Sequence, residues 1–344
     1  MAVSVGEGAA APVVLGLDFG GTKVAAAVCS LSGECLGTSL VATGRDEGAA
    51  VVLERAASNG RALLDGTGSG ARLAAVGVAT IGIPRKERVE LAPAIAGWEG
   101  LALGATLEER FGVPVRAAND VKAAAAAEAR FGALAGADPG VYLNLGTGLG
   151  AAVVVGGQVV AGAHGAAGEV GYNLVGLSGL GVAIGERPML EDSVSGIGLA
   201  AAGSRLLGRP VTAEEVFDRA SAGDEQLDDL VSALVAELSL HLVNLVNAID
   251  PARIAVGGGM VRSFDRLTGP IEAALKTGTP FPPELVLAAR PLDAALVGAA
   301  LLGFEAAGAP APGRLRWTGG EVLEVPVRRP GKAGATEDER GARG

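Results

Sequence analysis

Two stretches of the chain share one pattern of apolar and glycine positions. In residues 13–28 an apolar run breaks into Gly-Gly-Thr-Lys at 20–23 and then resumes, and residues 141–155 repeat this pattern around Gly-Thr-Gly at 146–148. Each copy predicts a β-hairpin with a tight turn that large side chains do not obstruct. Such turns let backbone N–H groups and a Thr hydroxyl approach a phosphate closely. The two copies therefore predict two halves that hold one polyphosphate, as in a nucleotide-dependent enzyme.

Outside the hairpins, the apolar positions follow helical spacing in some segments and form short buried runs in others. The predicted helical segments are 46–64, 107–111 (the end of a helix), 121–131, 225–248 and 294–306. The predicted strands are 73–79, 113–117 and 253–256. This alternation predicts an α/β fold.

The length of the chain bears on its division into domains. A chain of 344 residues exceeds what one compact core usually supports, which favours two domains. We expect an N-terminal α/β domain over residues 1–118 that regains the helix at about 294–306, and a larger C-terminal α/β domain over 119–293. Pro, Gly and mixed charge predict an extended or disordered tail over 309–344.

Charge and hydropathy argue against several classes of protein. The 28 Lys and Arg against 38 Asp and Glu give a net charge of −10, which disfavours a nucleic-acid binder held by phosphate contacts. Glycines and charges interrupt each apolar run before it reaches membrane-spanning length. The first twelve residues lack the basic n-region of a secretory signal. We therefore expect a cytoplasmic protein with no nucleic-acid partner and no membrane attachment.

The cysteines and histidines bear on disulfide and metal chemistry. Cys29 and Cys35 flank a predicted turn, so a disulfide is an alternative to two reduced thiols, the commoner state in a cytosolic enzyme. His164 and His241 are the only histidines, and these four residues are scattered along the sequence. Such scatter argues against a structural zinc site.

The dipeptide Asn119-Asp120 follows a predicted strand and opens a predicted helix. In an open α/β sheet, ligands collect at this edge. Two interpretations stay open, because Asn and Asp are preferred as helix N-caps, whereas a carboxylate near a phosphate site can accept the proton of an attacking alcohol. The position between two predicted phosphate-binding hairpins favours the second interpretation.

Other residues near the glycine turns have similar alternatives. Asp18 is either an ordinary turn residue or a ligand of Mg²⁺, directly or through water. Lys23 either touches a phosphate or is a solvated lysine. Glycines 257–259 follow a strand, where they form either an ordinary loop or the floor of a nucleoside site. Glu169 lies among glycines and accepts hydrogen bonds either from the turn or from a polyol substrate.

Several motifs, in one order over roughly residues 13–306, are similar to those of the ROK family (repressor, open reading frame, kinase), whose kinases phosphorylate sugars. The matching segments are 17–23, 118–120, 145–150, 165–171, 190–191, 195–196, 256–259 and 295–300. The resemblance implies the actin-like ATPase (ribonuclease H-like) fold, in which two α/β domains enclose a nucleotide cleft.

The resemblance also implies roles for individual residues. Asp120 corresponds to the catalytic base that takes the proton from the attacking sugar hydroxyl. The positions on the sugar side are Asn119, Glu169, Glu191 and Gly82. The implied cofactors are ATP and Mg²⁺, with Asp18 near the metal, directly or through water. The positions on the nucleotide side are Asp18, Gly20, Gly21, Thr22, Lys23, Gly146, Thr147, Gly148, Gly257, Gly258 and Gly259.

The chain departs from the family on the sugar side. Tyr172 stands where family kinases usually follow Glu-x-Gly with His, and residues 178–189 lack the Cys-x-Cys-Gly-x-x-Gly-Cys segment that binds zinc with that His. Arg85 ends a turn that is usually Gly-x-Pro-Gly, and Ala94 stands where Asn is frequent. These changes predict that the zinc site is lost and that the acceptor is altered.

The expected function is ATP-dependent phosphorylation of a hydroxyl of a hexose such as glucose. One alternative is a kinase for a C7-cyclitol or an amino sugar in a specialised biosynthetic pathway, and another is a non-catalytic ligand-binding member of the family. A repressor is disfavoured, since about a dozen residues precede the first predicted strand, too few for a helix-turn-helix. The expected partner is a small-molecule sugar or cyclitol, and a homodimer is left open.

Overall fold

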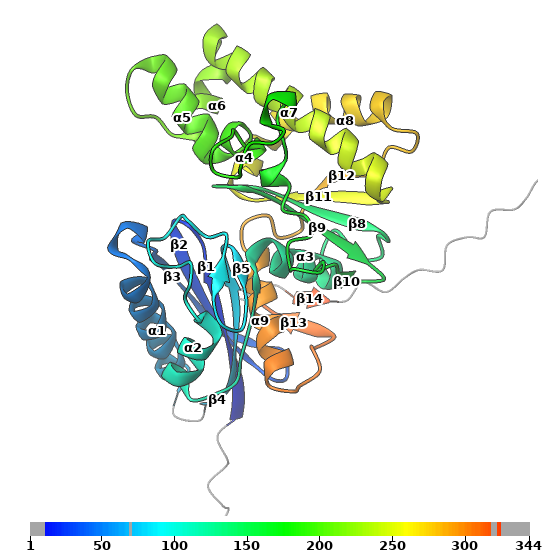
Figure 1. Cartoon of the computed structure of the whole chain (residues 1–344). Helices are drawn as coiled ribbons and strands as arrows, with labels where there is room; N and C mark the ends of the chain where they lie inside the picture. Colours follow the sequence, from blue (N-terminus) through cyan, green and yellow to red (C-terminus); the bar gives the residue numbers. More distant parts are fainter. Residues whose placement is uncertain (1–10, 69–70, 318–321, 325–344) are drawn as a thin grey trace, which may run out of the picture.

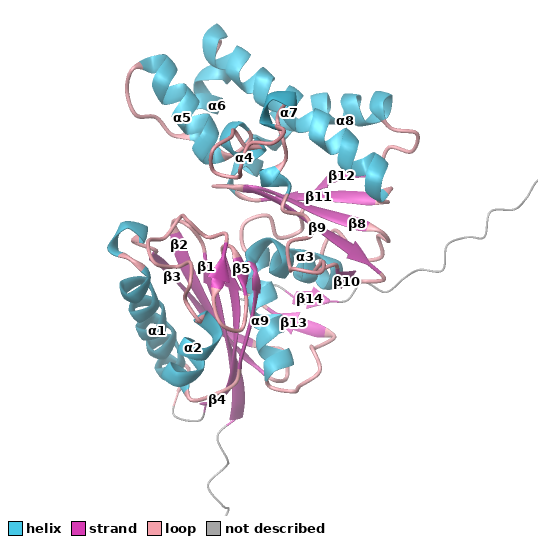
Figure 2. Cartoon of the chain, viewed as in Figure 1, coloured by secondary structure: helices cyan, strands magenta, loops and turns pink. Residues whose placement is uncertain are grey.

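The computed structural model describes residues 11–68, 71–317 and 322–324 and contains two five-stranded sheets with the same topology (Figures 1 and 2). The first consists of β1 (Ala11–Phe19), β2 (Lys23–Ser30), β3 (Cys35–Ala42), β4 (Ala71–Thr80) and β7 (Val115–Asn119), in the order β3-β2-β1-β4-β7. The second consists of β8 (Gly140–Leu145), β9 (Leu149–Val155), β10 (Gln158–Val159), β11 (Arg253–Gly257) and β12 (Glu284–Leu287), in the order β10-β9-β8-β11-β12. In each sheet three antiparallel strands continue into two parallel ones. The repeated hairpin of the sequence is therefore part of a repeated sheet.

Helices cover both faces of each sheet. On the first sheet, α1 (Ala49–Gly66) and α2 (Leu103–Phe111) pack on one face and α9 (Ala294–Ala306) packs on the other. On the second sheet, α3 (Asp120–Phe131) covers one face. The opposite face is covered by α4 (Leu190–Ser193), α5 (Gly196–Leu207), α6 (Ala213–Ser221), α7 (Glu225–Ile249) and α8 (Phe264–Gly278). Figure 1 shows α3 and α9 packed together between the two sheets.

Several short elements complete the described structure. A small hairpin joins β5 (Ile83–Pro84) to β6 (Val89–Glu90), and another joins β13 (Arg314–Arg316) to β14 (Val322–Glu324). The 3₁₀ helices are η1 (Arg45–Glu47), η2 (Val170–Tyr172), η3 (Leu177–Gly179) and η4 (Gly259–Ser263).

The apolar character of β1 follows from its central position. Leu15 and Leu17 point toward α1 and α2, whereas Val14 points toward α9, and all three are fully buried. A strand covered on both faces needs a continuous apolar run. By contrast, β3 lies at the edge of its sheet, where alternate residues are exposed and the others are only partly buried.

Glycines allow α9 to approach its neighbours at backbone distance. A Cβ atom on Gly77 of β4 would collide with the carbonyl oxygen of Ala299, and one on Gly16 of β1 would lie 2.9 Å from the backbone nitrogen of Ala300. On the other side of α9, a Cβ atom on Gly298 would collide with the carbonyl oxygen of Ala123 in α3. These contacts fix the spacing between the first sheet, α9 and α3, and with it the start of α3.

The helices and strands predicted from periodicity are confirmed, with ends shifted by a few residues. The elements that the pattern did not predict include β3, β12, α5 and α6. The predicted domain boundary after residue 118 stays a prediction, because α3 contacts strands of both sheets.

The predicted disulfide alternative is wrong. Cys29 and Cys35 lie opposite each other in the β2–β3 pair and are not joined by a disulfide bond.

The described part of the tail, which the sequence predicts to be extended or disordered, includes the strands β13 and β14. Leu315 of β13 is fully buried and Trp317 is nearly so, in the cluster that contains α9. The Arg290 guanidinium lies over the Trp317 ring, 5.5 Å from its centroid. The apolar surface of α9 supplies the partner that this short segment needs to fold. Residues 318–321 and 325–344 lie outside the described residues.

One described helix, α7, contradicts the expectation that no apolar segment reaches membrane-spanning length. By length and composition alone, α7 is long and apolar enough to cross a membrane. One face of it is nevertheless part of the protein core, since Leu227, Leu234, Leu238 and Leu242 pack in the cluster beside the second sheet. A core helix of this length needs no membrane to bury its apolar side chains.

Candidate functional site

The two glycine turns lie face to face. The β1–β2 turn is closed by a 3.0 Å hydrogen bond from the Gly20 N–H to the Lys23 carbonyl, and the second turn has a 3.0 Å hydrogen bond from the Gly146 N–H to the Gly148 carbonyl. A Cβ atom placed on Gly21 would lie 3.7 Å from Thr147 Cγ2, so the two turns lie side by side. The exposed side chains of the two turns are those of Thr22, Lys23 and Thr147. Hydroxyl, ammonium and backbone N–H donors thus gather at one place, which suits phosphate groups.

The third glycine segment lies directly beside the second turn. Gly258 has a φ of 94°, and a side chain there would collide with the carbonyl oxygen of Leu145. A Cβ atom on Gly146 would lie 3.6 Å from the backbone nitrogen of Gly259. Only glycine fits such a close approach with this backbone conformation. The fold therefore brings the residues predicted for adenosine and for phosphate binding together.

Of the two interpretations of Asn119-Asp120 that the sequence left open, the structure assigns the helix cap to Asn119. The Asn119 side chain is the N-cap of α3, since its Oδ1 accepts a 3.2 Å hydrogen bond from the Lys122 backbone N–H. Its Nδ2 donates to the carbonyl of Gly82 at 3.1 Å, which joins two residues predicted for the sugar side. Asp120 is instead the first residue of the helix, where its Oδ1 accepts from the Val121 N–H at 2.9 Å. The helix cap therefore does not depend on Asp120.

Two carboxylates at this place have raised pKa values. Burial raises the pKa of Asp18 to about 8, and the charge of Asp120 adds to the effect. Burial also raises the pKa of Asp120 to about 6, with a smaller contribution from Glu169, while the hydrogen bond from Val121 lowers it. Paired, desolvated carboxylates with raised pKa values are typical of functional sites.

The donor set suits a magnesium ion bound together with phosphates. Asp18 lies at the end of β1 beside the first glycine turn and offers hard carboxylate oxygens, which Mg²⁺ prefers. Within residues 11–68, 71–317 and 322–324, no group of three His, Cys, Asp or Glu side chains could hold a metal ion. Mg²⁺ would therefore take much of its coordination from phosphate oxygens and water, as it usually does. The absence of zinc stays a prediction.

Glu191 and Glu169 approach the same place from the second sheet. Glu191 Oε2 accepts a 2.7 Å hydrogen bond from the Leu149 N–H, directly after the second turn. A Cβ atom on Gly171 would lie 3.3 Å from that of Glu191, so the loop that carries Glu169 packs against it. Burial raises the pKa of Glu191, and the charges of Asp192 and Glu169 contribute. The two predicted sugar-side carboxylates are thus near neighbours.

The sequence reasoning missed Lys122, and it noted Arg85 only as a departure from the family motif. Lys122 is buried, and its Nζ lies 3.4 Å from Glu169 Oε1. Arg85 Nη2 donates to the carbonyl of His164 at 2.6 Å, and its Nε donates to Glu90 at 2.9 Å. Lys122 is the second residue after a candidate base, on a helix that is otherwise rich in alanine. That position was the feature of the sequence that could have identified Lys122 as a site residue.

Hydrogen bonds hold the segment in which the family's zinc cysteines are missing. Arg187 Nη2 donates to the carbonyl of Tyr172 at 2.9 Å, and the Leu190 N–H donates to the carbonyl of Asn173 at 3.2 Å. Leu174 and Met189 form an isolated antiparallel bridge. Burial raises the pKa of the Tyr172 phenol, with Glu169 and Glu191 contributing, so this residue stays a neutral hydrogen-bonding group.

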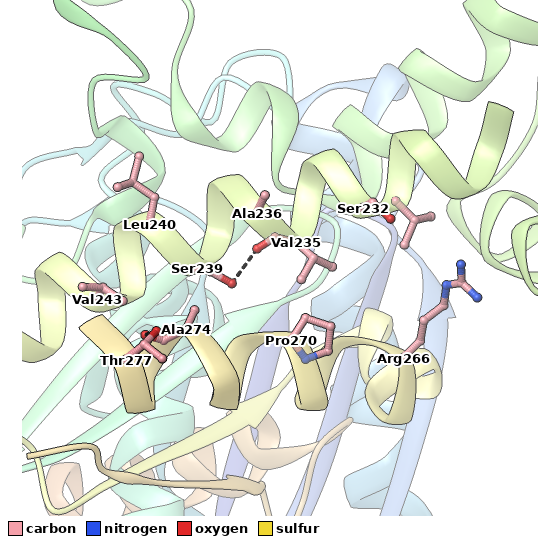
Figure 3. Close-up of a pocket in the computed structure, with 11 residues that line it drawn as sticks. Ser232, Val235, Ala236, Ser239, Leu240, Val243, Arg266, Pro270, Ala274 and Thr277 are labelled. Atoms are coloured by element: carbon pink, nitrogen blue, oxygen red, sulfur yellow. Dashed lines mark hydrogen bonds between the residues drawn. The ribbon is translucent and has the colours of Figure 1, made fainter. Parts of the chain in front are cut away.

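A groove of about 710 Å³ lies elsewhere, between α7 and α8 (Figure 3). Figure 3 shows mainly apolar and small side chains along it, including Val235, Leu240 and Pro270, with Arg266 at one end. None of the predicted site residues lines this groove. The candidate site is therefore the place where the turns and carboxylates meet.

Comparisons with known proteins agree with this geometry. Residues 14–305 match the model of the ROK family. The chain is 28% identical to a glucokinase from Halalkalibacterium halodurans over 275 residues, 75% of this chain and 83% of the relative. It is 30% identical to an N-acetylmannosamine kinase from Yersinia pseudotuberculosis over 258 residues, 72% of this chain and 82% of the relative.

A solved structure extends the similarity to the fold. The chain resembles a ROK family glucokinase from Streptomyces griseus in complex with glucose and AMPPNP, with a TM-score of 0.70, 30% identity, and coverage of 85% of this chain and 99% of that one. The expected actin-like ATPase fold is confirmed by this likeness together with the mixed sheets described above.

Proposed function

This chain belongs to the ROK family and is an ATP-dependent carbohydrate kinase, and from this premise we propose that it phosphorylates a hydroxyl of a hexose such as glucose. The observation that carries the proposal is that the two glycine turns lie side by side, so that a Cβ atom on Gly21 would lie 3.7 Å from Thr147, with the Asp120 carboxylate near Asp18. Phosphoryl transfer depends on positioning and charge neutralisation more than on covalent chemistry. The relatives that are glucokinases support a hexose as acceptor.

In this proposal, Asp120 is the general base that accepts the proton of the attacking hydroxyl. Asn119, Glu169, Glu191 and the backbone of Gly82 bind the other hydroxyls of the sugar. When bound, Mg-ATP supplies the phosphoryl group, and its metal neutralises charge on the phosphate oxygens. The residues assigned to hold it are Asp18, near the metal directly or through water, and Gly20, Gly21, Thr22, Lys23, Gly146, Thr147, Gly148, Gly257, Gly258 and Gly259.

Tyr172 keeps a second candidate function open, which is a kinase for an amino sugar or a C7-cyclitol. The Tyr172 phenol lies near Glu169 and Glu191, where other family kinases have an imidazole, so the lining of the sugar site differs. The relative that is an N-acetylmannosamine kinase supports an amino-sugar derivative as an alternative acceptor.

We further propose that the protein is cytoplasmic. Light scattering of the purified protein decides between a monomer and a homodimer.

The test is an ATP-consumption screen over hexoses, amino sugars and cyclitols in the presence of Mg²⁺. We expect the highest kcat/KM with a neutral hexose, and product analysis identifies the hydroxyl that is phosphorylated. The highest value with a cyclitol or an amino sugar would favour the second candidate. If no acceptor supported phosphoryl transfer while ATP still bound, the chain would be a non-catalytic ligand-binding member of the family.

The raised pKa of Asp120 predicts the pH dependence of the reaction. A general base works in its ionised form, and burial raises the pKa of this carboxyl from 3.8 to about 6. We therefore expect kcat/KM to rise with pH through about 6 and to fall roughly tenfold per pH unit well below that value. Initial rates between pH 4.5 and 8 at saturating Mg-ATP measure this. A profile that stays flat down to about pH 4.5 would contradict a base with this raised pKa.

A further inference from the structure

Lys122 is a buried lysine in the first turn of α3, two residues after Asp120. Its side chain is 9% exposed, and its ammonium lies 3.4 Å from Glu169 Oε1, whose side chain is 24% exposed. Lysine is almost never buried without a partner. The pair joins α3, whose first residue is the proposed base, to the loop of a proposed sugar-binding residue.

Lys122 is the described cation that pairs with a proposed sugar-binding carboxylate. The charge of Glu169 raises the pKa of both Asp120 and Glu191. Arg85 instead pairs with Glu90 and donates to the His164 carbonyl, and Arg187 donates to the Tyr172 carbonyl. The Lys122 charge also lowers the pKa of Asp120 and so favours its ionised form.

The geometry leaves the ammonium with hydrogen-bonding capacity. An ammonium group has three N–H donors, and its contact with Glu169 is long for a charge-assisted hydrogen bond, which is usually about 2.7–2.9 Å. A sugar hydroxyl both donates and accepts, so a lysine and a glutamate together can satisfy it. A protonated amine can only donate, and it would be repelled by the lysine.

We propose that Lys122 is a specificity-determining residue that binds a neutral hydroxyl of the acceptor together with Glu169 and disfavours an acceptor with a protonated amine. The inference rests on the proposed function and narrows its substrate class to neutral sugars, including N-acylated ones. Without the lysine, Glu169 would keep a full negative charge available for an amine. Two unit charges 4 Å apart near a protein surface interact with a free energy that corresponds to well over a tenfold change in Kd.

The experiment compares glucose with glucosamine at a pH where the amine is protonated. Steady-state kinetics give kcat/KM for each sugar at saturating Mg-ATP, and calorimetry gives the Kd of each sugar. Lys122→Met removes the charge and keeps most of the side-chain length, whereas Lys122→Arg keeps the charge. Lys86→Met, at an exposed lysine, is the matched control.

In Lys122→Met we expect the glucosamine-to-glucose ratio of kcat/KM to rise at least tenfold, mainly through KM, with the same change in the ratio of affinities. Lys122→Arg and Lys86→Met should keep the wild-type ratio. If Lys122 only braced the Glu169 loop, Lys122→Met would weaken both sugars equally, and that result would overturn the proposal. A ratio that changed equally in Lys122→Arg would also overturn it.

The two readouts separate this inference from the proposed function. A wild-type enzyme that binds glucose over glucosamine through Lys122 but transfers no phosphoryl group would overturn the kinase proposal and support the role of Lys122. If the enzyme phosphorylated hexoses but Lys122→Met left the glucosamine-to-glucose ratio of kcat/KM unchanged, the kinase proposal would be supported and the role of Lys122 would be overturned. Thermal melting of Lys122→Met confirms that each comparison is made on folded protein.

Discussion

The Asp120→Asn enzyme is expected to lose turnover by roughly 10²–10⁴-fold, because an amide has no basic oxygen to accept the proton of the attacking hydroxyl. The substitution preserves the shape of the side chain and its ability to accept the hydrogen bond from the Val121 N–H. The N-cap of α3 is Asn119, so the helix start is unaffected. Acceptor-dependent ATP turnover measures the loss, and ATP affinity and Tm should barely move.

Asp224→Asn is the matched control for this substitution. Asp224 is the N-cap of α7, where its Oδ1 accepts from the Leu227 N–H at 3.4 Å, far along the chain from the proposed base. Asn caps a helix about as well as Asp, but it loses the charge that pairs with Arg219 Nη2 at 2.6 Å. Turnover should therefore be retained and the Tm should fall only slightly. Near-wild-type turnover in Asp120→Asn would rule out Asp120 as the base, whatever the control shows.

The second large effect is expected on stability. Gly298→Ala should destabilise the protein by roughly 3 kcal/mol or more, at the upper end of overpacking effects. A Cβ atom on Gly298 would collide with the Ala123 carbonyl oxygen and lie 2.8 Å from the Ala123 Cα, both backbone atoms that cannot rotate away. The α3–α9 contact must therefore open. Chemical denaturation and the Tm measure the loss.

Gly104→Ala is the control that separates this steric effect from helix propensity. Gly104 also lies in a helix, α2, but a Cβ atom there meets no other atom within 4 Å. Alanine should therefore stabilise α2 slightly, by about 0.5–1 kcal/mol. If Gly298→Ala were equally harmless, α3 and α9 would not be packed at backbone distance.

Gly298→Ala should also lower turnover at temperatures where the protein is still folded, because a displaced α3 moves Asp120.

Local patterns in the sequence were sufficient to predict the elements that carry the site. The apolar run, glycine turn and apolar run at 13–28 predict β1, β2 and the turn between them, and the same holds for β8 and β9. The segment that opens with Asn119 predicts the end of β7 and the start of α3. These features depend on residues that are neighbours along the chain, because those residues set the backbone conformation and the period of buried positions. A single sequence is therefore enough to predict them.

The sequence by itself determined the two glycine hairpins, the order of the family motifs and the helices α1, α3, α7 and α9, because each is encoded in residues that are close together along the chain. Only the tertiary structure decided which groups meet. Gly21 lies beside Thr147, and Lys122 pairs with Glu169 across 47 positions of sequence. It also assigned the helix cap to Asn119 rather than Asp120, and packed Trp317 into the cluster with α9. Such contacts depend on the approach of surfaces far apart in the chain, a distance that glycines such as Gly298 set and that no local pattern encodes.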